Sequence, residues 1–152
     1  MTALNVVVLA AGQGKRMYSN LPKVLHKLAG KPMLQHVMDS ANALNPSKMC
    51  IVYGHGGETV RNAFADCAAV WAKQEPQLGT GHAVLQAVPH LDNDGLTLIL
   101  YGDVPLTRSD SLKQLTDVAQ SGKLAVLTIE LNDPTGYGRI VRDSKGNITG
   151  IV

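Results

Sequence analysis

Short apolar runs alternate along the chain with stretches whose apolar residues recur at helical spacing. Runs that are rich in β-branched and apolar residues predict strands. The run at 96–101 is continuous, which is typical of a parallel strand that is buried on both faces. The predicted strands span residues 5–10, 49–53, 69–72, 96–101 and 124–131.

Amphipathic stretches between these runs predict helices. One begins at Pro32, a favourable residue for a first turn, and its apolar positions fall at intervals of three and four. Ser109 and Asp110 are expected to cap another, because their side chains can accept hydrogen bonds from free backbone N–H groups. The predicted helices span residues 32–44, 58–65, 81–88 and about 110–120, and a terminal hairpin pairs 140–142 with 147–152.

This alternation predicts a single α/β domain over residues 1–152. We expect a doubly wound, mostly parallel, Rossmann-like sheet with helices on both faces. Ligands of such sheets bind at the carboxyl ends of the strands. Candidate functional residues should therefore follow the predicted strands.

The composition excludes several classes of function. The 152 residues are 45% hydrophobic and 17% charged, and their net charge of +2 is too small to indicate nucleic acid or an anionic membrane. No apolar run approaches the roughly 20 residues that a membrane span needs, and no cationic leader precedes the first strand. Cys50 and Cys67 lack metal-ligand spacing, which favours buried thiols in a reducing compartment. We expect a cytoplasmic protein without nucleic-acid or membrane partners.

A glycine turn directly follows the first predicted strand. Gly12 and Gly14 allow backbone N–H groups to approach an anion without interference from a Cβ atom. Arg16 and Lys23 follow them, and such cations can neutralise the charge of a phosphate. The segment therefore predicts a phosphate-binding loop.

A carboxylate follows the strand at 96–101. Gly102 and Asp103 end this strand at the edge that the glycine turn also occupies, provided that the strands are parallel. Taken alone, such an aspartate is more often a turn former or a helix cap. Opposite a phosphate loop it becomes a candidate magnesium ligand, because nucleotide-bound Mg²⁺ takes one or two protein carboxylates together with phosphate oxygens.

A polar segment, QEPQLGTGHA at residues 74–83, follows the third predicted strand. The side-chain amides of Gln74 and Gln77 each offer a donor and an acceptor, as the edge of a pyrimidine base requires. A capped loop with Thr80 as the N-cap residue is the simpler interpretation. That interpretation leaves the two glutamines unexplained.

Several motifs in order resemble a known family. The string LAAGQGKRM at residues 9–17, followed by Pro22 and Lys23, resembles the signature of the sugar-1-phosphate nucleotidyltransferases that use nucleoside triphosphates. The segments at 74–83 and at 133–140, DPTGYGRI, are similar to the uridine and sugar segments of its N-acetylglucosamine-1-phosphate uridylyltransferase branch. The resemblance covers essentially the whole chain.

The resemblance implies a role for each matching residue. Arg16 and Lys23 would bind the triphosphate and stabilise the charge that develops as pyrophosphate leaves. Asp103 would hold Mg²⁺ beside the sugar phosphate. The other matching residues would contact the uridine, the phosphates or the sugar: Leu9, Ala10, Ala11, Gly12, Gln74, Gln77, Gly79, Thr80, Tyr101 and Gly138.

The implied reaction transfers the uridylyl group of UTP to N-acetylglucosamine 1-phosphate, for cell-wall and lipopolysaccharide precursors. In this family further residues of the sugar and metal sites lie beyond position 152, and a β-helical acetyltransferase domain makes the trimer. We therefore expect this chain to be an incomplete uridylyltransferase domain that binds UTP and turns over poorly. The five histidines are expected to be structural or on the surface.

Other functions stay open. The opening loop also suits a molybdopterin guanylyltransferase or a cytidylyltransferase, and only the segment at 74–83 argues for uracil. A nucleotide-binding module without catalysis is a further alternative. A dinucleotide-dependent oxidoreductase is disfavoured, because Met17 stands where the third glycine of the fingerprint belongs.

Overall fold

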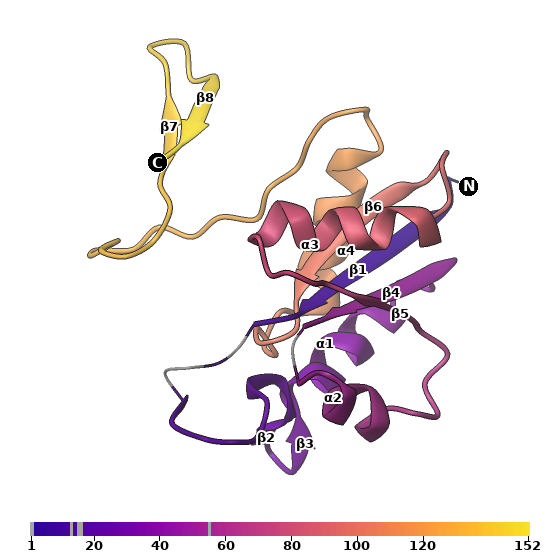
Figure 1. The fold of residues 1–152 in the computed structure, drawn as a ribbon. Coiled ribbons are helices and arrows are strands. Elements are labelled where there is room, and N and C mark those ends of the chain that lie inside the picture. The colour runs from indigo at the N-terminus through magenta and orange to yellow at the C-terminus, as the bar shows by residue number, and fades with distance from the viewer. Residues whose placement is uncertain (1, 13, 15–16, 55) are drawn as a thin grey trace.

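A parallel sheet forms the centre of the computed structural model, which describes residues 2–12, 14, 17–54 and 56–152. All three strand pairs of this sheet are parallel. The strand order is β5-β4-β1-β6, so the chain moves outward from β1 on one side and then adds β6 on the other (Figure 1). This confirms the doubly wound, mostly parallel α/β prediction. The strands are β1 (Leu4–Ala10), β4 (Lys48–Tyr53), β5 (Val70–Lys73) and β6 (Leu96–Tyr101).

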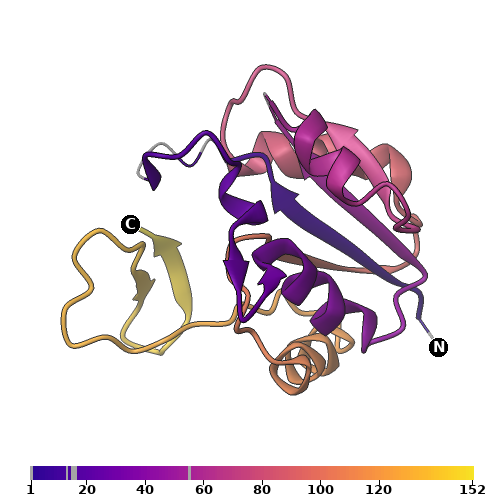
Figure 2. The same cartoon turned by 90° about the horizontal axis from the view of Figure 1, so that it is seen from below.

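Helices cover both faces of the sheet (Figure 2). Residues of α1, α2 and α4 pack in one core, and residues of α3 pack in the other. A short 3₁₀ turn and a two-stranded ribbon connect β1 to α1. The helices are α1 (Met33–Asn42), α2 (Glu58–Ala63), α3 (Thr80–Ala87) and α4 (Ser109–Ala119), with 3₁₀ turns η2 (Lys23–Leu25) and η3 (Val88–His90) and the ribbon β2 (Lys27–Leu28) and β3 (Lys31–Pro32).

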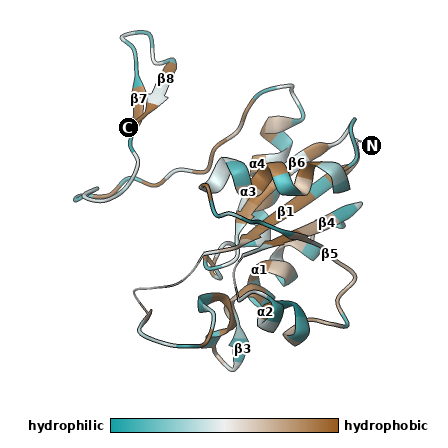
Figure 3. Ribbon diagram, in the orientation of Figure 1, coloured by the Kyte–Doolittle hydropathy of each residue, from teal (hydrophilic) through white to brown (hydrophobic). Residues whose placement is uncertain are grey.

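Alternate residues of β1 supply the two cores. Val6 and Val8 belong to the larger core, whereas Val7 and Leu9 belong to the core under α3. All four side chains are buried, and each such burial contributes about 1.5–3 kcal/mol. The central strands are accordingly the most hydrophobic part of the ribbon (Figure 3).

The thiol of Cys50 lies in the core under α3. It is fully buried, and burial raises its pKa to about 11. Cys50 and Cys67 are both free thiols, but only Cys50 is buried as the sequence predicts, whereas Cys67 is partly exposed. The Cys50 side chain is therefore a packing element that stays protonated rather than a nucleophile.

A buried amide fixes the entry to β6. The side chain of Asn5 is fully buried and makes two hydrogen bonds with the backbone of Asp92. Asn5 Nδ2 donates to Asp92 O at 3.0 Å, and Asn5 Oδ1 accepts from the Asp92 N–H at 3.0 Å. Both halves of the amide are thus satisfied, which the burial of a polar group requires.

Two sequence predictions about strands are wrong. Residues 124–131 form no strand, because the described sheet ends at β6 and supplies no paired neighbour for them. The strand β6 is buried on one face only: Leu98 and Leu100 are buried, whereas Ile99 is 43% exposed and Tyr101 is 52% exposed. An edge strand that no helix covers on its second face keeps these apolar side chains in contact with solvent.

The predicted helices and the terminal hairpin are present. The cap predicted for α4 differs, since Ser109 begins the helix and Arg108 occupies the N-cap position without a side-chain hydrogen bond. The hairpin consists of β7 (Ile140–Arg142) and β8 (Ile148–Ile151), and it stands away from the sheet (Figure 1). Among the described residues, no helix has the length and apolar character to cross a membrane.

Truncation of a buried leucine should destabilise the domain through the larger core. Leu34 on α1 is fully buried, so we expect Leu34→Ala to lower the free energy of unfolding by about 2–5 kcal/mol. Denaturant titration followed by circular dichroism measures this change. Leu85 on α3 is 64% exposed, and the matched control Leu85→Ala should stay within about 0.5 kcal/mol of the parent. Equal losses in the two variants would contradict the assignment of the core.

Candidate functional site

A cavity of about 350 Å³ opens at the carboxyl ends of β1 and β6. It lies where the strand order reverses, which is the usual ligand position in a doubly wound sheet. Segments that lie far apart in the sequence meet around it. Its lining consists of Leu9, Ala10, Ala11, Gly12, Lys23, Val24, Gln74, Gln77, Gly79, Thr80, Ala83, Tyr101 and Asp103.

Of the predicted substrate-binding residues that the structure describes, the lining contains all but Gly138. Gly138 lies at the hairpin, where a Cβ atom on it would come 3.2 Å from the Ile151 side chain. The structure therefore gathers the residues predicted for the nucleotide and leaves the predicted sugar residue outside the cavity. Arg16, predicted to bind the triphosphate, lies outside the described residues.

The glycine turn brings the end of β1 against Lys23. Gly14 has a φ of +59°, and a Cβ atom on it would lie 3.0 Å from the Cβ of Lys23. A residue with a side chain is therefore disfavoured there for both its backbone angle and its contact. The close approach sets Lys23, at the start of η2, on the cavity wall.

An ion pair crosses the cavity. Lys23 Nζ donates to Asp103 Oδ2 at 2.7 Å, although the two residues are 80 positions apart in the sequence. Their side chains are 36% and 34% exposed, so both remain open to a ligand. The charges of Lys23 and Asp103 neutralise each other. An incoming phosphate would compete with Asp103 for the Lys23 ammonium group.

Asp103 reaches the cavity because the turn after β6 is tight. The Gly102 N–H donates to Leu9 O at 2.9 Å, which continues the β1–β6 pairing by one residue. A Cβ atom on Gly102 would lie 3.2 Å from Leu9 O and 3.3 Å from side chains of Leu34 and Val24. Glycine therefore permits this approach, and the next residue, Asp103, lines the same cavity as the glycine turn.

The donor set at Asp103 suits a metal that is held mainly by its substrate. Among the residues that the structure describes, no group of three or more His, Cys, Asp or Glu side chains could hold a metal ion alone. A single carboxylate fits Mg²⁺ bound to a nucleotide, because phosphate oxygens and water supply the other ligands.

Two glutamines form the opposite wall. Gln77 donates from its side-chain amide to Ala11 O and so ties this wall to the glycine turn. Gln74 is only 4% exposed, and its backbone N–H donates to Tyr53 O at 2.8 Å beyond the end of β5. Its side-chain amide donates to Gly79 O at 3.0 Å. The wall is thus held by both backbone and side-chain hydrogen bonds.

The loop before α3 differs from the simple capping interpretation. Thr80 is the first residue of α3, and Gly79 occupies the N-cap position with a φ of +96°. No side chain caps this end of the helix. Thr80 is therefore available on the cavity wall, since it is not used as the cap.

The sequence analysis does not single out two lining residues, Val24 and Ala83. Ala83 lies four residues after Gly79, and its N–H donates to Gly79 O at 3.1 Å. Helical spacing from the glycine would have indicated that it shares this face. Val24 follows Lys23 in a 3₁₀ turn whose formation the apolar pattern does not reveal.

Comparison with known proteins identifies relatives over the whole chain. The family model of the MobA-like NTP transferase domain matches residues 6–143. The curated protein named Bifunctional protein GlmU from Nitrosospira multiformis is 61% identical over 153 residues, which cover 100% of this chain and 33% of that protein. The chain thus spans about a third of the length of this curated relative.

Solved structures share the fold at lower identity. HddC from Yersinia pseudotuberculosis superposes with a TM-score of 0.74 at 20% identity, over 100% of this chain and 69% of that chain. Rv0371c from Mycobacterium tuberculosis in complex with manganese superposes with a TM-score of 0.67 at 21% identity, over 79% of this chain and 61% of that chain. At these identities the likeness concerns the fold alone.

A side chain at Gly54 should disturb the contact between the two walls. A Cβ atom there would lie 2.7 Å from Ala11 O and against the Gln77 amide. We expect Gly54→Ala to lower the free energy of unfolding by about 1–3 kcal/mol, because the site is overpacked. Denaturant titration provides the measurement.

Gly81 on α3 provides the matched control for Gly54→Ala. A Cβ atom on Gly81 would meet nothing within 4 Å, so Gly81→Ala should stabilise the helix by about 0.5–1 kcal/mol. A stability of Gly54→Ala equal to that of the parent would show that the two walls are not in close contact.

Proposed function

Because the chain belongs to the MobA-like NTP transferase domain family of nucleotidyltransferases, we propose that its cavity binds a nucleoside triphosphate and transfers the nucleotidyl group to a sugar 1-phosphate. The observation that carries this proposal is the convergence of three groups on one cavity: the glycine turn, the Lys23–Asp103 pair and the wall of glutamines. A phosphate loop, a cation and a metal-ligand carboxylate form the minimum that phosphoryl transfer requires.

The proposed substrates are UTP and N-acetylglucosamine 1-phosphate, and the proposed products are UDP-N-acetylglucosamine and pyrophosphate. A pyrimidine is favoured because Gln74 and Gln77 line the cavity with side-chain amides, which match the edge of a pyrimidine. The choice of uracil rests on the resemblance of residues 74–83 to the uridylyltransferase branch. The sugar rests on the resemblance of residues 74–83 and 133–140 to the uridylyltransferase branch. Such a product would supply cell-wall and lipopolysaccharide precursors.

The proposed reaction is an in-line displacement at the α-phosphorus of UTP. An oxygen of the sugar phosphate forms the new bond to this phosphorus, and the bond to the bridging oxygen of pyrophosphate breaks. Lys23 and Arg16 would neutralise the charge that accumulates on the leaving pyrophosphate, and the backbone N–H groups of the glycine turn would position the phosphates. No protein nucleophile is needed, since positioning and charge stabilisation supply the rate enhancement.

We propose that Asp103 holds Mg²⁺ in the loaded site. When bound, the metal would neutralise phosphate charge between the two substrates. The single carboxylate in the cavity and the Lys23 side chain beside it suit this arrangement. Phosphate contacts to Lys23 would release Asp103 for the metal.

Further parts of the proposal concern the longer protein. We propose that its absent part carries an acetyltransferase and forms a trimer, as the family resemblance implies. A cytoplasmic location is proposed on the free thiols of Cys50 and Cys67. We also propose slow turnover for this chain, a view that the position of Gly138 outside the cavity lining supports.

Calorimetric titration with UTP, CTP and GTP in Mg²⁺ tests nucleotide binding. We expect the chain to prefer UTP. Lys23→Ala and Arg16→Ala should each weaken UTP binding about ten- to hundredfold, because each removes a charge-assisted contact to phosphate. Lys113→Ala is the matched control, since Lys113 lies on α4 away from the cavity lining.

The outcome of this titration separates the candidate functions. A preference for GTP or CTP would indicate a guanylyl- or cytidylyltransferase instead. No triphosphate binding by a folded chain would refute the proposal. Unchanged UTP affinity in Lys23→Ala would show that Lys23 does not bind the phosphates.

Replacement of the Asp103 carboxylate should weaken metal binding in the presence of the nucleotide. We expect Asp103→Asn to weaken Mn²⁺ binding in the presence of UTP by at least roughly tenfold, since even outer-shell partners of a metal contribute that much. Electron paramagnetic resonance of free Mn²⁺ measures the change. Asp110→Asn on α4 is the control and should bind Mn²⁺ with UTP as the parent does. Equal affinities in the two variants would show that Asp103 is not a metal ligand.

A further inference from the structure

Both hydrogens of the Gln74 side-chain amide have a hydrogen-bond acceptor within reach. Its Nε2 donates to Gly79 O at 3.0 Å and lies 3.2 Å from His82 Nδ1. A backbone carbonyl only accepts, so the nitrogen of this amide must face Gly79. The second hydrogen of the same nitrogen then faces the ring of His82.

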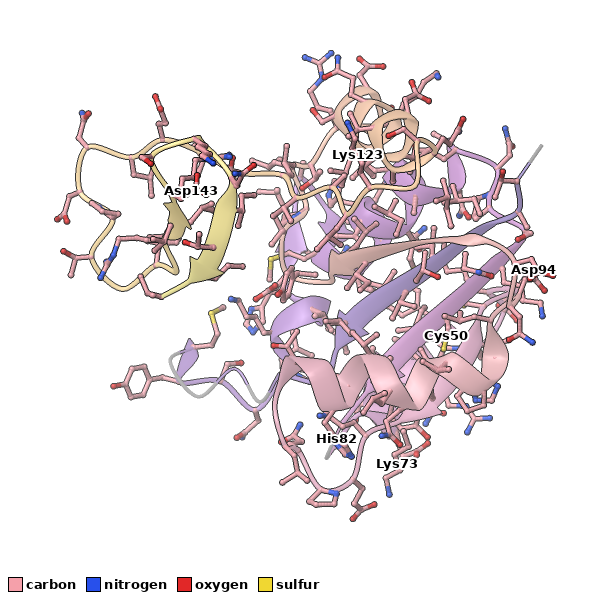
Figure 4. All side chains as sticks on the ribbon, turned by 90° about the horizontal axis from the view of Figure 1, so that it is seen from above. Cys50, Lys73, His82, Asp94, Lys123 and Asp143 are labelled. Carbon is pink, nitrogen blue, oxygen red and sulfur yellow. The ribbon has the colours of Figure 1, made fainter. Side chains whose placement is uncertain are left out.

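His82 lies in the first turn of α3, where Figure 4 labels it. Its other ring nitrogen, Nε2, lies 3.1 Å from Gln86 Nε2. A neutral imidazole has one donor and one acceptor, so the two glutamine amides cannot both donate to it. The Gln86 nitrogen already donates to the backbone O of His82 at 3.1 Å, and we therefore assign the ring acceptor at Nδ1 to Gln74.

The hydrogen of this tautomer is then on His82 Nε2. Gln86 stands one helical turn beyond His82 on α3, which keeps the two side chains adjacent. The contact of His82 with Gln74 thus links α3 to the cavity wall.

This orientation leaves one hydrogen-bonding atom of Gln74 for a ligand. Both amide hydrogens are committed, no described residue donates to Gln74 Oε1, and Gln74 lines the cavity. The residue therefore presents an acceptor and no donor. Opposite the ring N3 of a base, this acceptor would pair with the N3–H of uracil. The ring N3 of cytosine is itself an acceptor, and the donor on the cytosine edge is its N4 amino group.

We propose that His82 is a positioning residue that holds the Gln74 amide with its carbonyl oxygen toward the base, so that the site selects uracil over cytosine. The proposal rests on the proposed function of the cavity as a nucleotide site. It also revises the sequence expectation that His82 has only a structural role. His82 acts through Gln74 and need not touch the nucleotide itself.

The test compares UTP with CTP in two variants of His82. In His82→Leu the Gln74 amide is free to turn, so the ratio of UTP to CTP affinity should fall roughly tenfold. In His82→Asn an amide oxygen replaces the Nδ1 acceptor and should restore most of the ratio. His90→Leu is the control, because His90 is an exposed histidine on the adjacent turn η3.

A purely structural role for His82 predicts a different result. In that case His82→Leu would weaken UTP and CTP binding equally, and His82→Asn would be as defective as His82→Leu. Either result would overturn the proposal, and so would an unchanged ratio in His82→Leu.

A second measurement needs no nucleotide. Long-range ¹H–¹⁵N nuclear magnetic resonance reports which ring nitrogen of His82 carries the hydrogen, and we expect Nε2. The Gln74 amide hydrogens should exchange slowly in the parent and in His82→Asn, and faster in His82→Leu. A hydrogen on Nδ1, or equal exchange in all three proteins, would overturn the positioning role. A parent that does not prefer UTP would refute the proposed function, while this experiment would still decide the orientation of Gln74.

Discussion

The parallel pairing of β1 with β6 is the constraint on which the rest of the site depends. Its register places Leu9 opposite Tyr101, and the Gly102 N–H extends the pairing to Leu9 O at 2.9 Å. Since parallel strands end at the same edge, the glycine turn after β1 and the carboxylate of Asp103 after β6 open on one cavity. A shift of one residue in this register would turn Asp103 to the other face of the sheet.

Several polar side chains of the cavity already have protein partners before any ligand arrives. Lys23 and Asp103 neutralise each other, and Gln77 donates to the glycine turn through Ala11 O. Gln74 is fixed by Gly79 and His82. Such preorganisation lowers the ordering cost of binding, because the side chains already stand on the walls that a nucleotide would contact. In the proposed site, a phosphate on Lys23 and a metal on Asp103 would each break the same ion pair, so the binding of one would favour the binding of the other.

Different observations support the fold, the family and the proposed function of this protein. Structures at about a fifth sequence identity share the doubly wound sheet, and such a sheet supports many chemistries. The match over residues 6–143 establishes the family. The proposed choice of uracil depends on the side chain of Gln74, whose amide contacts Gly79 before α3 and His82 on α3. The proposed substrate therefore depends on the orientation of a few side-chain amides and not on the fold.

The sequence by itself determined the elements that depend on local pattern: the central strands, the helices, the glycine turn after β1 and the residues that follow each strand. These follow from periodicity and from the special conformations of glycine, which neighbouring residues fix. Only the tertiary structure decided that 124–131 is unpaired, that β6 is an edge strand, that Lys23 meets Asp103 across 80 positions, and that His82 contacts Gln74. Each of these depends on which segments become neighbours in space. Strand pairing and side-chain hydrogen bonds have no local sequence signal, because their free energy belongs to the pair and not to either residue.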